Sequence, residues 1–372
     1  MKVLYVGCYR DGTGWGQAAT DYILAMDSVG IDVVPRPVKL NKNNIPIPNR
    51  ITELERKDSS GAEVCIQHIL PHLMEYTPKF KKNIGLYATE TSNFIDSGWS
   101  RKINMMDEAW VINNQMFKSS QASGVEIPIK VVPHASNFSK FGQSYGKTNF
   151  PSASDNFIFY TIADLNKRKN LEAFITAFHA EFDPSEPVSI LIKSSKYGLS
   201  EEEAALKVRD ICNEIKIGLK RFPSIDDYKE DLIVTSFISE EDIYKIHTSC
   251  DCFVMPSYGE AWCIPAFDAM GFGKTPICTN VGGMSDFIGH GGFLIEGVDE
   301  PVTGMLETFN NLFTGNEFWS SISIKELMRC MRHVYEQRDA LNKMREEGLK
   351  QAQKYSHKNI GNLIKDLLNA NS

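Results

Sequence analysis

Residues 251–276 constrain the fold more than any other part of the chain. They begin with a short apolar run, DCFVM, which is typical of a strand buried on both faces of a parallel sheet. Polar residues and a glycine interrupt the run, and Pro265 then marks the first turn of a helix, where proline is well tolerated. Gly271 and Gly273 end that helix, because glycine readily adopts the conformation of a helix end. A strand, a tight loop and a helix in this order predict one unit of an α/β fold.

Two acidic residues lie in this stretch, Glu260 in the loop and Asp268 about one turn inside the helix. Open α/β sheets bind ligands at the carboxyl ends of their strands, and the free N–H groups of a helix N-terminus bind phosphate there. Since carboxylates repel phosphate, the two acids are better suited to accept hydrogen bonds from hydroxyl groups. The pattern predicts a nucleotide-sugar site. The alternative is an ordinary turn residue and an acid that compensates the helix dipole.

The string PSYGEAWCIPAFDAMGFGKTP, residues 256–276, resembles the Glu-x7-Glu motif of retaining GT-B glycosyltransferases of group 1, also called glycosyltransferase family 4. The resemblance implies that Glu260 contacts the donor sugar and that Asp268 holds the ribose hydroxyls. Asp268 is one methylene shorter than the glutamate of the family. The donor-binding residues that the resemblance implies in the loop itself are Ala261, Trp262, Cys263 and Ile264.

Length and composition restrict the class of protein. A chain of 372 residues exceeds one ordinary core and predicts two domains. No stretch approaches the roughly 20 apolar residues that span a bilayer, and the net charge of −7 argues against general nucleic-acid binding. Most of the eight cysteines lie in apolar runs, which indicates reduced thiols in a cytoplasmic protein. No spacing of cysteine and histidine fits a standard zinc site, so we expect no metal.

Strands and helices alternate along residues 2–133, which predicts a parallel sheet with helices on both faces. Residues 141–155 are rich in Gly, Ser and Pro and predict a linker, and a second α/β domain begins at residue 156. The resemblance implies a GT-B architecture, in which two Rossmann-like domains face each other across a cleft. Residues 1–145 would form the acceptor-side domain, residues 146–356 the donor domain, and a final helix at 357–372 would pack back on the first domain.

A glycine-rich loop, RDGTGWG at residues 10–16, separates the first predicted strand from a helix at residues 17–29. Its glycine spacing differs from the dinucleotide fingerprint, which argues against a nicotinamide oxidoreductase. The resemblance places Gly14, Trp15 and Gly16 against the phosphate or sugar of the donor. The alternative is a tight turn with Trp15 packed on a neighbouring element.

Polar residues end two further predicted strands, His68 the strand at 63–68 and Glu90 the strand at 82–90. Many proteins of the family carry a histidine of the reaction site where this chain has Glu90. Glu90 therefore serves in its place, or the role moves to His68 or His72. A carboxylate there stabilises an oxocarbenium-like transition state or orients an acceptor hydroxyl. The alternatives are that Glu90 caps a turn and that His68 and His72 are ordinary structural histidines.

Arg168 and Lys169 directly precede a predicted helix at residues 171–182. Two cations at a helix N-terminus oppose the helix dipole, so they indicate a bound anion rather than a solvated basic turn. The resemblance matches Lys169 to a lysine that grips the diphosphate. The matching arginine position is Asp164, and Arg168 then provides the missing charge. The resemblance also places Ile238 and Ser239 beside the nucleotide base.

Together these inferences predict a glycosyltransferase that moves a sugar from a UDP- or GDP-sugar to a hydroxyl group with retention of anomeric configuration. The acceptor is a glycan or another hydroxyl compound, and no cofactor is expected. Two alternatives remain: a catalytically weak protein that binds nucleotide sugars or glycans, and a GT-B epimerase or phosphorylase. The departures from the family pattern at Glu90, Asp164 and Asp268 keep the first alternative open.

Overall fold

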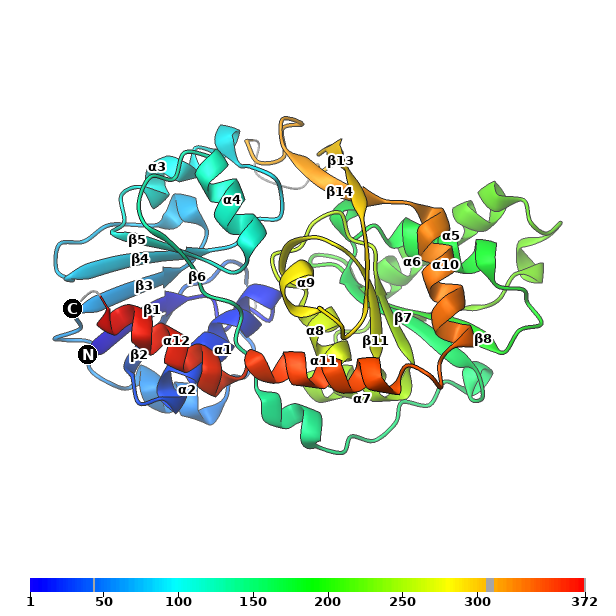
Figure 1. The fold of residues 1–372 in the computed structure, drawn as a ribbon, viewed down its shortest axis with the longest axis horizontal. Helices are drawn as coiled ribbons and strands as arrows, with labels where there is room; N and C mark the ends of the chain where they lie inside the picture. Colours follow the sequence, from blue (N-terminus) through cyan, green and yellow to red (C-terminus); the bar gives the residue numbers. More distant parts are fainter. Residues whose placement is uncertain (43, 306–310, 371–372) are drawn as a thin grey trace.

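The computed structural model describes residues 1–42, 44–305 and 311–370 and contains two six-stranded parallel sheets, each flanked by helices (Figure 1). The strand orders are β2-β1-β3-β4-β5-β6 and β12-β11-β10-β7-β8-β9. The prediction of an α/β protein with two parallel sheets is therefore confirmed. A small antiparallel hairpin, β13-β14, accompanies the second sheet.

The first sheet and its helices occupy the N-terminal part of the chain. Helix α1 begins at Gly14 rather than at residue 17, because Thr13 caps it by accepting a hydrogen bond from the Gly16 amide. Strand β4 ends at Tyr87, where its ladder with β5 ends, so Glu90 lies in the following loop and not in the strand as predicted. The elements are β1 Lys2–Gly7, α1 Gly14–Ser28, β2 Asp32–Pro37, α2 Asn49–Glu55, β3 Val64–His68, β4 Lys82–Tyr87, α3 Trp99–Ile103, β5 Glu108–Val111, α4 Asn114–Ala122 and β6 Ile129–Val131.

The second sheet follows the same alternation of strands and helices. Gly282 and Gly283 form the first turn of helix α9. Strand β9 ends at Val234, where its ladder with β8 stops. The elements are β7 Phe157–Asp164, α5 Leu171–Glu181, β8 Val188–Ser195, α6 Glu201–Leu219, β9 Asp231–Val234, α7 Glu240–Ser249, β10 Cys252–Met255, α8 Ile264–Gly271, β11 Thr275–Thr279, α9 Gly282–Phe287 and β12 Phe293–Ile295.

Strand β12 is followed by a hairpin of two further strands, β13 (Gly297–Pro301) and β14 (Phe318–Ile322). Both strands are short and most of their side chains are exposed or half-buried, so they lack the apolar run that reveals a core strand. The hairpin contacts the N-terminal half: the Ser92 amide donates to the Phe318 carbonyl at 2.9 Å, and the Asn316 amide donates to Asp96 at 2.6 Å.

Three helices close the chain: α10 (Ile324–Glu336), α11 (Asn342–Lys354) and α12 (His357–Asn369). Helix α12 packs against α1 of the first sheet, as Figure 1 shows. Its buried residues Ile360 and Ile364 join the core that contains Ile23. The helices approach closely at Gly361, where a Cβ atom would lie 2.2 Å from the Ala25 carbonyl oxygen. Helix α12 therefore packs on the sheet formed by the first part of the chain.

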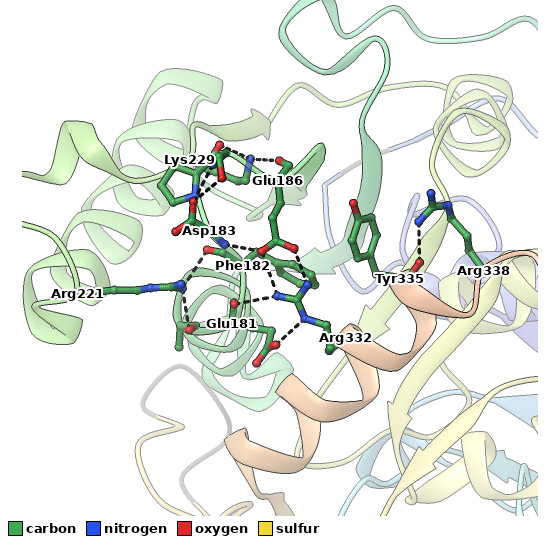
Figure 2. Close-up of polar contacts among 12 residues, drawn as sticks. Glu181, Phe182, Asp183, Glu186, Arg221, Lys229, Arg332, Tyr335 and Arg338 are labelled. Carbon is green, nitrogen blue, oxygen red and sulfur yellow. Dashed lines mark hydrogen bonds and ion pairs between the residues drawn. The ribbon is translucent and has the colours of Figure 1, made fainter.

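Arginines fix the end of helix α5, the helix that begins beside Arg168 and Lys169. Arg332 of α10 bonds the carboxylates of Glu181 and Glu186 at 2.7 and 2.5 Å and lies 4.5 Å above the ring of Phe182 (Figure 2). Arg221 donates to three main-chain carbonyl groups at the same end, including that of Phe182. The last carbonyl groups of a helix have no partner within the helix, so these contacts satisfy them and hold α5 in place.

Candidate functional site

The strand order of the second sheet defines a crevice. Strands β7, β8 and β9 run outward to one side and β10, β11 and β12 to the other, so the order reverses between β7 and β10. Ligands of open α/β sheets bind at such a switch point, outside the carboxyl ends of the strands. The loop after β7 carries Arg168 and Lys169, and the loop after β10 carries Glu260.

These two loops and the loop after β4, which carries Glu90, bring four of the predicted site residues together. The Lys169 ammonium lies 2.6 Å from a Glu260 carboxylate oxygen, and Arg168 lies 3.2 Å from the same oxygen. Arg168 also approaches the carboxylate of Glu90 at 3.5 Å and donates to the Gly259 carbonyl at 2.5 Å. The cluster therefore joins one loop of the first domain to two loops of the second.

The cluster is largely shielded from solvent, because the Glu260 side chain is 5% exposed and those of both cations are 14% exposed. Burial alone would raise the pKa of Glu260, but the charges of Lys169 and Arg168 outweigh it and the pKa is lowered. Burial likewise opposes the charge of Arg168, yet Glu90 and Glu260 raise its pKa. Both groups are charged at neutral pH and hold each other by charge-assisted hydrogen bonds.

Two glycines allow the Glu260 loop to pack closely. A Cβ atom on Gly259 would lie 2.1 Å from the Glu90 carbonyl oxygen, and one on Gly282 would lie 1.6 Å from the Glu260 carbonyl oxygen. Two residues at the start of α4 also hold this region: Asn113 donates to the Ala261 carbonyl at 2.5 Å, and Gln115 accepts from the Gly282 amide at 2.7 Å. The sequence analysis missed both side chains.

Replacing Gly282 by alanine should therefore destabilise the protein more than the same replacement at a glycine that has a positive φ but open space around it. Its φ of +58° strains any residue with a Cβ, and the added atom overlaps the Glu260 carbonyl. We expect urea denaturation to show a loss of about 2–5 kcal/mol. The matched control is Gly30→Ala, where φ is +79° but nothing lies within 4 Å, so about 1–2 kcal/mol is expected. Equal losses in the two variants would contradict the packing argument.

The N-terminus of α8 lies directly behind Glu260. Cys263 precedes the helix with φ of +71°, and no side chain caps the helix there. Trp262 is buried, and its ring lies 5.0 Å from the rings of Phe287 and Tyr355, so its side chain belongs to the core between the two domains. The first main-chain N–H groups of α8 therefore have no side-chain cap, and they follow Glu260 in the chain by only a few residues.

Asp268 lies inside α8 and is buried, with an oxygen 2.7 Å from the ammonium group of Lys140. Lys140 comes from the segment that links the two domains and was not identified from the sequence. Burial raises the pKa of Asp268 to about 6, although Lys140 opposes the rise. The predicted ribose residue is thus already paired with a cation, and no contact joins it to Glu260.

The predicted histidine His68 is buried at the end of β3. Its Nδ1 lies 2.7 Å from the Tyr5 hydroxyl, and its ring lies 5.1 Å from that of Trp15. Burial, followed by the charge of His134, lowers the pKa of His68 to about 3. His68 is therefore a neutral, hydrogen-bonded histidine, and its role in the reaction stays a prediction. His72 is exposed, with its ring 6.3 Å from that of Trp99.

The remaining predicted residues lie on α1, in the segment before α7 and at the end of β7. Gly14, Trp15 and Gly16 form the first turn of α1. The neighbouring Gly12 faces the second domain, since a Cβ atom on it would lie 3.6 Å from the ring of Phe237. Ile238 is half-buried, and the exposed Ser239 caps α7 by accepting from the Asp242 amide. Asp164 is exposed and accepts from Asn166 at 2.8 Å, so it does not join the cluster.

Within the described residues, no group of three or more His, Cys, Asp or Glu side chains is arranged to hold a metal ion. In the same part of the chain, no helix has both the length and the apolar character needed to cross a bilayer.

Comparison with known proteins finds similarity in sequence over part of the chain. The profile of the family "Glycosyl transferases group 1" matches residues 226–301, which include Glu260 and Asp268. The serotype-specific mannosyltransferase WbdA of Escherichia coli is 30% identical over 138 residues, which are 36% of this chain and 15% of that protein. The chain thus matches only a small part of the length of this relative.

Solved structures resemble the whole chain. The Anabaena protein Alr3699/HepE, in complex with UDP, aligns over 100% of both chains with a TM-score of 0.66 and 13% identity. Sucrose-phosphate synthase from Thermosynechococcus elongatus aligns equally completely, with a TM-score of 0.68 and 13% identity. At this identity the likeness concerns the fold, and it confirms the predicted GT-B architecture.

Proposed function

We propose that the protein is a retaining glycosyltransferase that moves a sugar from a nucleoside diphosphate sugar to an acceptor hydroxyl. The observation that carries this proposal is the pairing of Glu260 with Arg168 and Lys169 at the switch point of the second sheet. The family match over residues 226–301 and the partial likeness to a mannosyltransferase support it. The free cysteines, all buried or half-buried, suit the reducing cytoplasm, where we place the reaction.

In this proposal the diphosphate of the donor binds between the two cations and the N-terminus of α8. Phosphate oxygens accept charge-assisted hydrogen bonds from Arg168 and Lys169, which then release Glu260. The freed carboxylate accepts hydrogen bonds from hydroxyl groups of the donor sugar. As the bond from the sugar to the diphosphate breaks, the cations and amides stabilise the negative charge of the leaving group, which is a large catalytic contribution.

Glu90 is the carboxylate that the first domain contributes to this cluster. We propose that it orients the acceptor hydroxyl or stabilises positive charge on the sugar ring in the transition state. Retention means that the acceptor oxygen replaces the diphosphate on the same face of the sugar. We propose that protein groups alone perform this step, without a metal or another cofactor.

Thermal unfolding with a ligand panel tests the proposal. The panel contains UDP, GDP, ADP, NAD and sugar nucleotides, including those of mannose because the matched relative is a mannosyltransferase. A ligand at 100 times its dissociation constant stabilises the fold by about 2.7 kcal/mol, which is visible as a higher midpoint. We expect a higher unfolding midpoint with one nucleoside diphosphate and with its sugar nucleotides. An assay of sugar transfer to an acceptor then follows, and NMR of the product identifies its anomeric configuration.

Each alternative gives a different result in these assays. A shift with NAD alone would overturn the proposal in favour of an oxidoreductase. Donor binding without turnover of any acceptor would indicate a nucleotide-sugar binding protein. Turnover that requires inorganic phosphate and releases a sugar phosphate would indicate a phosphorylase, and conversion of the nucleotide or its sugar without an acceptor would indicate an epimerase.

A further inference from the structure

Lys193 is a buried lysine without a hydrogen bond or ion pair to any residue in the described ranges 1–42, 44–305 and 311–370. It is 5% exposed, and a buried ammonium group normally has a partner. The other buried lysines among these residues follow that rule: Lys140 pairs with Asp268 at 2.7 Å and Lys216 with Asp231 at 2.6 Å. Lys193 therefore has unused capacity to donate hydrogen bonds.

Lys193 lies at the ligand-binding edge of the second sheet. It stands near the carboxyl end of β8, in register with Ile162 of β7 and Val234 of β9. Paired residues of neighbouring strands share a face, and Ile162 packs in the core formed by α7 and α8. The Lys193 side chain is thus on the α7–α8 face, at the end where residues 235–239 lead from β9 into α7.

The position of β8 separates Lys193 from the proposed diphosphate site. Strand β8 is two strands from β10, and strands lie about 4.8 Å apart, so Lys193 is displaced by roughly 10 Å from the strand that leads to α8. Arg168 and Lys169 already stand at the switch point, beside the proposed phosphates. When the phosphates bind at the switch point and the nucleotide extends toward β9, its nucleoside rather than its phosphates lies beside Lys193.

The apolar side chains between β9 and α7 are suited to contact a flat base. Ile238 is an apolar residue that packs on the core, and Phe237 is 70% exposed beside Gly12 of the first domain. Such side chains can cover the faces of a base, while a cation reads its edge. An ammonium group only donates hydrogen bonds, so it needs an acceptor at that edge.

We infer that Lys193 binds a carbonyl oxygen of the donor base and thereby selects a uracil or guanine nucleotide over an adenine nucleotide. Uracil and guanine present carbonyl acceptors on the edge where adenine presents an amino group. That amino group is a donor, so it would face the donor-only ammonium group of Lys193 unfavourably. The inference rests on the proposed function, since it specifies the donor nucleotide of the same site.

The test compares wild type with Lys193→Met by calorimetric titration with UDP, GDP, ADP and inorganic pyrophosphate. We expect affinity for the preferred nucleotide to fall about 10- to 100-fold and the preference over ADP to disappear, while pyrophosphate affinity stays unchanged. The variant should unfold at the same or a higher temperature, because an unpaired buried charge is removed. The matched control is Lys216→Met, which should lose stability but keep wild-type nucleotide affinity.

The possible failures are distinguishable. Wild-type protein that binds none of UDP, GDP and ADP would contradict the proposed function itself, whereas wild-type protein that prefers ADP would overturn the inference about Lys193 alone. Wild-type protein that prefers UDP or GDP, with the same preference in Lys193→Met, would overturn the inference about Lys193 alone. An equal loss of pyrophosphate affinity would assign Lys193 to the phosphates and would also overturn base selection.

Discussion

Replacing Glu260 by glutamine should reduce sugar transfer by a factor of about 10²–10⁴ without weakening the binding of the nucleoside diphosphate. Glutamine has nearly the same shape but carries no charge, so contacts to the sugar that strengthen in the transition state are lost. Arg168 and Lys169, which Glu260 partly neutralises at 3.2 and 2.6 Å, lose this competing carboxylate and become more available to the diphosphate. The product of the reaction, the nucleoside diphosphate, should therefore bind as tightly as before or more tightly.

Two measurements separate this result from unfolding: donor turnover at saturating substrate and titration with the nucleoside diphosphate. Glu108→Gln is the matched control, because Glu108 is also buried and pairs with a lysine, Lys82, at 2.7 Å. That variant should lose stability but retain transfer. If Glu260→Gln transfers sugar like wild type, or if both affinity and transfer fall in parallel, the proposed role of Glu260 is wrong.

The sequence was informative where structure is local. Residues 251–276 encode a strand, a loop and a helix in one continuous segment, so the place of Glu260 at the sheet edge followed from its neighbours. Arg168 and Lys169 were recognisable because cations before a helix oppose its dipole. Their convergence on Glu260 also depended on the strand order, which only the resemblance to a known family implied.

Features that depend on contacts between distant segments could not be predicted in this way. Asn113 and Lys140 are unremarkable in sequence, and their partners Ala261 and Asp268 lie more than a hundred residues away. The hairpin β13-β14 has no core-facing apolar run, because its strands pair with each other at the edge of the domain. Periodicity reports burial within an element, whereas these features arise from how elements meet.

The ion pair between Lys140 and Asp268 gives the second large expected effect. Replacing Lys140 by methionine leaves Asp268 buried without its cation, and breaking a buried pair costs about 3–5 kcal/mol. For domains of this size we expect the unfolding midpoint to fall by roughly 10 °C. Because Lys140 lies in the segment between the two domains and Asp268 lies in α8, the loss should also loosen α8, whose N-terminus is part of the proposed phosphate site.

The pH dependence of this loss identifies its cause. Burial already raises the pKa of Asp268 to about 6, and without Lys140 it should rise further. A carboxyl group whose pKa is raised on folding stabilises the fold while it is protonated, and this contribution is lost as the pH rises through the folded-state pKa. Lys140→Met should therefore be most destabilised at pH 8 and closest to wild type near pH 5, as measured by thermal unfolding.

A double-mutant cycle separates the contribution of the ion pair to stability from the contribution of the packing of the lysine stem. Lys140→Met combined with Asp268→Asn removes both charges, so the double variant should be more stable at pH 8 than Lys140→Met alone. It should also lose the extra dependence on pH between about 5 and 8 that the single variant shows. If the two substitutions instead add independently, with the same pH profile as wild type, then Asp268 is not held by Lys140. Its carboxylate would then be available for the ribose contact that the resemblance implied.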